Sequence, residues 1–129
     1  MSHPVEDIDD GDLLYKWVPR SKFDAEGRPD AVVFRDKGAG MSTSWSRHCT
    51  AEECREGLDR PRHVGVVSLP VGAVRAAPHA QEIRHSPKTW PHLPKQGRAH
   101  TDVVGKKDAE TQLKMQRLAL LCVKPDPCK

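Results

Sequence analysis

The sequence predicts an α+β fold, a small mixed sheet of four to six short strands with a C-terminal helix packed on one face. Two observations predict it. Short apolar runs bounded by Pro and Gly recur over residues 12–104, which is typical of strands. Residues 107–123 then contain no Pro or Gly and many strong helix formers, which is typical of a helix.

Length and composition favour one small domain. The chain has 129 residues, 36% hydrophobic residues and a formal net charge of +3. We expect one domain over residues 12–123, a flexible acidic leader over 1–11 and a flexible tail over 124–129. No apolar run reaches the roughly 18 residues of a membrane span, and the acidic start is unlike that of a signal peptide. A cytoplasmic location is therefore expected.

Two strands and a short extended segment are predicted in the first third of the chain. Residues 13–18 alternate between two faces and stop at Pro19. After a charged loop, residues 31–34 are β-branched and aromatic, so they are predicted to be a second strand. A glycine-rich turn precedes residues 41–45, where a short extended segment is expected.

A short helix is predicted at Ala51. Thr50 and Glu53 have the spacing of a capping box, in which the threonine hydroxyl and the glutamate each bond the other residue's backbone N–H. Pro61 closes this segment, so the helix should be about two turns long.

The middle of the chain predicts the central strand. Residues 64–69 are short, apolar on both faces and bounded by prolines, and Pro70 suits the first position of a short helix. Residues 81–85 are predicted to be another strand, 86–98 a long loop, and 100–104 the last strand.

The predicted helix 107–123 has a wide apolar surface. One face carries Met115, Leu118, Ala119 and Cys122, and a second carries Leu113, Leu120 and Leu121. One interpretation is that the sheet covers one face and a loop the other. The alternative is that the second face binds a protein partner or a second copy of the chain.

The order of several short motifs resembles that of a family of short bacterial proteins with no assigned activity. That family shows an "lSv"-like segment, a T-x-E-E helix and a late N-x-A-H-x-x-x-x-G element. The matching residues here are Gly40-Met41-Ser42, Thr50 to Glu53, and Ala99-His100 with Gly105. Gln96, Gly97 and Arg98 stand where the asparagine is expected. The resemblance covers residues 13–121 and implies a related fold and a bacterial context.

Arg35 followed by Ser42-Thr43-Ser44 resembles the arginine and S-T-S elements of the ADP-ribosyltransferase superfamily. The resemblance implies that Arg35 positions dinucleotide phosphates and that the serines support a nicotinamide pocket. That superfamily also uses a glutamate in an E/Q-x-E arrangement, and Gln81-Glu82-Ile83 has a different spacing. The alternative is an ordinary strand end with a hydroxyl-rich turn.

His100 is the candidate for proton transfer, because an imidazole is the side chain best suited to it near neutral pH and this one begins a strand after a loop. A structural histidine bonded to a loop carbonyl is the alternative. The other common signatures, such as G-x-G-x-x-G, the P-loop and H-E-x-x-H, are absent from the sequence.

The cysteines predict reduced thiols and no metal site. Cys49 and Cys54 have four residues between them, at the edge of zinc-ligand spacing, and His48 precedes them. Whether these three residues bind a metal is left open. Cys128 is expected to be exposed in the tail and to react faster with a maleimide than Cys122, which is expected to pack on the helix.

Together these features favour a small non-enzymatic accessory or partner-binding protein of the bacterial cytoplasm. It is expected to have no cofactor and no membrane partner, and nucleic-acid binding is not expected because clustered basic and aromatic residues are lacking. The alternative is a nucleotide-binding or ADP-ribosyltransferase-like enzyme that uses Arg35, Ser42, Ser44 and His100.

Overall fold

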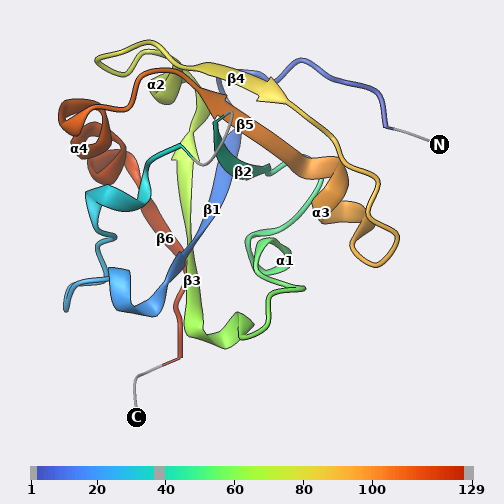
Figure 1. The fold of residues 1–129 in the computed structure, drawn as a ribbon, viewed down its shortest axis with the longest axis horizontal. Helices are drawn as coiled ribbons and strands as arrows, with labels where there is room; N and C mark the ends of the chain where they lie inside the picture. The colour runs from blue at the N-terminus through green and yellow to red at the C-terminus, as the bar shows by residue number, and fades with distance from the viewer. Residues whose placement is uncertain (1–2, 37–39, 127–129) are drawn as a thin grey trace.

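The computed structural model describes residues 3–36 and 40–126 (Figure 1). Among them are six strands: β1 (Leu13–Pro19), β2 (Met41–Trp45), β3 (Val64–Pro70), β4 (Glu82–His85), β5 (His100–Val104) and β6 (Leu120–Val123). The same residues form four α-helices: α1 (Ala51–Cys54), α2 (Val71–Arg75), α3 (Pro94–Ala99) and α4 (Ala109–Leu118). The predicted α+β class is confirmed.

All six strands belong to one sheet with the order β4-β5-β2-β1-β3-β6. Each neighbouring pair is antiparallel, so the sheet is antiparallel rather than mixed. The β1–β3 pair is the longest, with a register that runs from Leu13 opposite Pro70 to Pro19 opposite Val64. The apolar segment predicted to be the central strand therefore has a strand on each side, β1 and β6.

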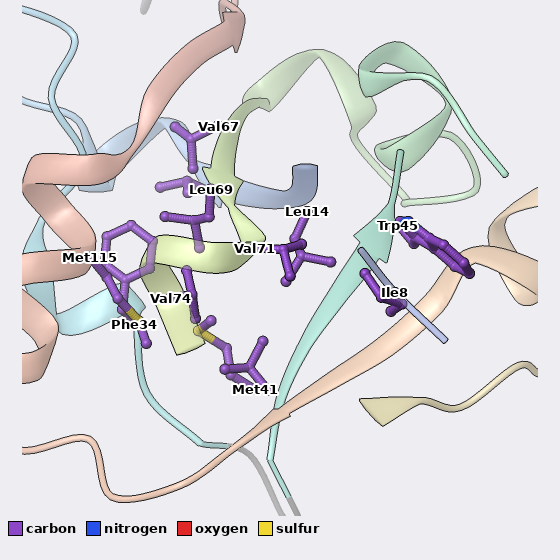
Figure 2. Close-up of a cluster of buried hydrophobic side chains, with 12 residues drawn as sticks. Ile8, Leu14, Phe34, Met41, Trp45, Val67, Leu69, Val71, Val74 and Met115 are labelled. Atoms are coloured by element: carbon purple, nitrogen blue, oxygen red, sulfur yellow. The ribbon is translucent and has the colours of Figure 1, made fainter. Parts of the chain in front are cut away.

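Alternation along β1 separates the two faces of the sheet. Leu14 and Val18 are fully buried on the face that carries the main core. Tyr15 lies on the opposite face and packs beside Val66 of β3. Figure 2 shows the main core, with Met115 of α4 and Phe34 at one end and Trp45 and Ile8 at the other. The C-terminal helix thus packs on one face, as predicted.

The segment predicted to be a second strand, residues 31–34, forms instead the 3₁₀ helix η2 (Ala31–Val33). The Asp30 carboxylate accepts a hydrogen bond from the Val32 backbone N–H at 3.0 Å and so caps this turn. The turn carries Phe34 into the core, where its side chain is fully buried. Local capping and burial of the aromatic ring outweigh the β propensity of the two valines.

The predicted helix 107–123 is too long by about two turns. α4 begins after Asp108, whose carboxylate accepts from the Thr111 N–H at 3.0 Å, and it ends at Leu118. Ala119 is extended, with φ −69° and ψ 131°, and the next four residues form β6 on the free edge of β3. Strand pairing with β3 outweighs the helix propensity of residues 120–123, because it gives hydrogen-bond partners to the backbone N–H and C=O groups along that edge. Leu120 and Leu121 are therefore not on the helix.

Two further expectations also change. The loop predicted over residues 86–98 contains α3, which starts at Pro94. Of the expected flexible leader, Ile8 is only 5% exposed and belongs to the main core. The Arg75 guanidinium donates to the Ile8 carbonyl at 2.6 Å and also pairs with Asp10. This part of the leader is packed against the domain.

Cysteine reactivity tests the position of Cys122, which lies on β6 and not on the C-terminal helix as predicted. Its side chain is exposed on β6, whereas Cys49 and Cys54 are buried, and burial raises the pKa of the Cys49 thiol to about 12. Cys128 lies outside the described residues, so the test uses Cys128→Ser as background. We expect Cys122 to react with a maleimide at least about tenfold faster than the other two, since access and thiolate content set the rate. Adding Cys122→Ser should remove the fast phase; a fast phase that persists would contradict the exposed strand.

Candidate functional site

A cavity of about 640 Å³ lies where β1 and β2 separate. These two strands pair only at Leu14 with Trp45 and at Tyr15 with Ser44, although β1 continues to Pro19 beside β3. The cavity is lined by the parts of both strands beyond the last pair, including Lys16 and Trp17 of β1 and Ser42 of β2. Its size lies within the usual range for small-molecule sites.

All four residues singled out from the sequence line this one cavity: Arg35, Ser42, Ser44 and His100. Strand register explains three of them. Ser44 of β2 lies opposite Tyr15 of β1 on one side and opposite His100 of β5 on the other, so the three side chains form a row across the sheet. Ser42 lies two residues before Ser44 and on the same face of β2. Arg35 comes from the end of η2.

Basic side chains outnumber acidic ones in the lining. Lys16, Lys22 and Arg35 contribute positive charge, and Glu56 contributes negative charge. Lys22 and Arg35 are exposed, and neither forms a side-chain ion pair with any other residue in ranges 3–36 and 40–126. The cavity therefore offers cationic groups to an anionic ligand.

Three aromatic side chains, Tyr15, Trp17 and Trp90, also line the cavity. Trp17 is 38% exposed and Trp90 is 41% exposed. Trp90 meets the His100 ring edge to face, with 5.9 Å between ring centroids. Large aromatic surfaces left accessible beside cationic groups provide stacking surfaces for a flat ring.

His100 is held by Ser86, which is in turn bonded to Asp102, and the sequence reasoning missed both residues. His100 Nδ1 lies 2.9 Å from the Ser86 hydroxyl and 3.1 Å from the Ser86 carbonyl oxygen. The Ser86 hydroxyl in turn donates to Asp102 Oδ2 at 2.9 Å. Asp102 could have been found as the residue two positions after His100 on the same strand face. Ser86 could not, because only the β4–β5 pairing brings it close.

Cys54 also lines the cavity, on α1. The helix starts at Thr50 with the predicted capping box: the Glu53 N–H donates to the Thr50 hydroxyl at 3.1 Å, and the Thr50 N–H donates to Glu53 at 2.9 Å. Burial raises the pKa of the Cys54 thiol, so it stays protonated at neutral pH. A protonated thiol is a poor nucleophile, so Cys54 acts here as an apolar wall.

One group of possible metal ligands occurs among the described residues: Glu6, His48 and His85, with donor atoms within 4.8 Å of one another. Cys49 and Cys54 are not part of it. Both ring nitrogens of His85 are already bonded: Nδ1 accepts from the Glu6 N–H at 2.9 Å, and Nε2–H donates to the Arg98 carbonyl at 2.6 Å. The group therefore anchors the N-terminal segment to the domain.

The charges in this anchor are consistent with that role. Burial alone would raise the pKa of Glu6, but the hydrogen bond and charge of His48 and the charge of Arg98 together lower it. Burial lowers the pKa of His48, and the contact with Glu6 offsets part of this. His48 thus donates from Nε2 to an ionised Glu6 at 2.6 Å.

The residues expected to bind a partner lie apart from this cavity. Leu113 is exposed on α4, and Leu120 and Leu121 are exposed on β6, where Leu120 is 67% accessible. The pair on β6 borders a smaller hollow of about 400 Å³ together with Ala119 and Arg28.

The glutamate motif of the ADP-ribosyltransferase resemblance does not reach the cavity. Gln81 is buried and donates to the carbonyls of His79 and Lys106 at 2.8 and 2.9 Å. Glu82 pairs with Arg84 on β4. The acidic residue that does line the cavity is Glu56, just after α1.

Comparisons with known proteins give no match to a family model, to a curated protein or to a solved structure. In the part of the chain that the structure describes, no helix has the length and apolar character needed to cross a membrane. The two resemblances seen in the sequence stay predictions.

Proposed function

We propose that this protein binds a nucleotide in the cavity between β1 and β2. The observation that supports this most is that Arg35, Ser42 and Ser44 meet His100, from a distant part of the chain, in one cavity. A ligand site needs a concave surface with a few convergent polar groups, and this cavity has both.

The chemistry of the lining fits the parts of a nucleotide. Arg35 and Lys22 suit phosphate oxygens, and an arginine can bind two of them at once. Tyr15 and Trp90 offer faces on which a base can stack. The hydroxyls of Ser42 and Ser44 can donate to or accept from the ligand.

Thermal stability tests this proposal with NAD, ADP and ATP as probes. A ligand at one hundred times its Kd stabilises the fold by about 2.7 kcal/mol, which raises Tm by roughly 10 °C for a domain of this size. We expect at least one probe to give such a shift. Arg35→Gln should weaken binding by about ten- to a hundredfold, because a charge-assisted hydrogen bond is lost.

Arg117→Gln is the matched control, since Arg117 lines the smaller hollow and not the cavity between β1 and β2. It should bind the probe like the wild type. No shift with any of the three probes, or equal losses in both variants, would contradict the proposal.

The second candidate function is an interaction with another protein through β6. The observation that favours it is the exposed edge strand: of the described strands only β3 pairs with β6, and Leu120 and Leu121 are exposed on it. An antiparallel strand from a second copy of this chain can pair with such an edge about a twofold axis.

Leu120→Asp tests the edge. We expect this substitution to raise the Kd of the dimer by about tenfold or more, because it buries a charge between the two paired strands. Light scattering over a concentration series measures this, and Val5→Asp, at another exposed apolar residue, is the control. A wild type that is monomeric at every concentration would rule out the self-association.

A further inference from the structure

The hydrogen bonds around His100 determine which of its ring nitrogens carries the proton. The Ser86 carbonyl, 3.1 Å from His100 Nδ1, can only accept a hydrogen bond. The single proton of the Ser86 hydroxyl goes to the Asp102 carboxylate. Toward His100 that hydroxyl is therefore an acceptor as well, so both contacts require a proton on Nδ1.

In the neutral form of the ring, Nε2 then carries an unprotonated lone pair. No other described residue forms a hydrogen bond with Nε2, and the ring lines the cavity. The two contacts of Nδ1 with Ser86 and the edge-to-face contact with Trp90 hold the ring in this orientation. His100 thus presents a fixed hydrogen-bond acceptor beside the cationic groups.

This acceptor selects among the parts of a nucleotide. Phosphate oxygens that are ionised can only accept, so they cannot bond to a bare lone pair. Ribose hydroxyls can donate, and so can the amino group of adenine. The hydroxyls are common to every ribonucleotide, and His100 lines the same cavity as the aromatic Trp90 and the cationic Arg35.

We propose that His100 accepts a hydrogen bond at Nε2 from a ribose hydroxyl of the bound nucleotide, and that Ser86 and Asp102 are positioning residues that keep its proton on Nδ1. The inference rests on the proposed nucleotide site. It deepens that proposal, because it makes the ligand a ribonucleotide rather than any phosphate compound.

Nitrogen NMR of the free protein tests the positioning step. Long-range ¹H–¹⁵N spectra distinguish the two neutral ring forms, and His100→Gln assigns the signal. We expect the Nδ1–H form in the wild type and in Ser86→Thr, which keeps the hydroxyl. Ser86→Ala should shift the ring toward the Nε2–H form. An Nε2–H ring in the wild type would overturn the inference whatever the protein binds.

Binding of ATP, 2′,3′-dideoxy-ATP and ITP tests the acceptor. The wild type should prefer ATP to the dideoxy compound by about three- to tenfold, the equivalent of one hydrogen bond. The preference should vanish in His100→Phe, fall in Ser86→Ala and return in Ser86→Thr. His79→Gln is the control, because His79 also pairs with an aspartate, Asp108 at 2.9 Å, but lies outside the cavity.

Three results would overturn the inference: equal affinity for ATP and dideoxy-ATP, a preference that persists in His100→Phe, or a loss of affinity only with ITP, which lacks the amino group. If the NMR form is as expected but no nucleotide binds, the proposed function fails and the hydroxyl contact with it. If only the positioning by Ser86 and Asp102 fails, the protein binds ATP normally but the NMR spectrum shows the Nε2–H form of His100.

Discussion

Trp45→Ala is expected to lower the free energy of unfolding by about 3–5 kcal/mol, the usual cost of removing a buried aromatic side chain. Trp45 is fully buried, its Nε1–H donates to Asp12 at 2.9 Å, and its ring meets His48 and His85 edge to face at 5.0 and 5.1 Å. The substitution leaves a cavity, an unpaired carboxylate and a loosened N-terminal anchor. For a domain with about 5–15 kcal/mol of total stability, this is roughly a fifth or more of the total.

Urea unfolding measures this change, and Trp90→Ala is the matched control. Trp90 is 41% exposed, so the same substitution there should cost about 1 kcal/mol or less. Similar losses in both variants would show that Trp45 is not the central packing residue that its burial indicates.

Gly97→Ala is expected to destabilise the protein by about 2 kcal/mol and to weaken nucleotide binding. Gly97 lies within α3, where alanine has the better helix propensity by about 1 kcal/mol. A Cβ at this position would overlap the Lys88 carbonyl oxygen, so the backbone there must move. Overpacking of this kind costs about 1–3 kcal/mol and also strains the hydrogen bond from the Lys88 N–H to the Gly97 carbonyl.

The effect on binding follows from what the displaced segment carries. Residues 86–90 include Ser86, which holds His100, and Trp90, which lines the cavity. Thermal unfolding with and without ATP measures both effects. Gly11→Ala is the control, because a Cβ there meets nothing within 4 Å. A Gly97→Ala protein more stable than the wild type would show that the backbone at Lys88 gives way at little cost.

How far the sequence predicts this molecule depends on the range of the interactions involved. The Thr50–Glu53 capping box, the alternation of β1 and the proline-bounded strand β3 are local patterns, and each is found where it was predicted. The four cavity residues could be grouped from the sequence into one hypothetical site, but no local pattern showed that they would line the same cavity. Their meeting depends on strand order, which is set by contacts between distant segments.

By itself the sequence determined the α+β class, the start of α1 and the central strand, because capping, side-chain period and proline geometry act within a few residues. Only the tertiary structure decided that α4 stops at Leu118 so that β6 can pair with β3. It alone also decided that residues 31–33 form a 3₁₀ helix, which buries Phe34. It also decided that β1 and β2 separate after Tyr15 and leave a cavity, and that Ser86, bonded to Asp102, contacts His100. These outcomes depend on strand pairing and side-chain burial between segments far apart in the chain, and local propensity does not predict such contacts.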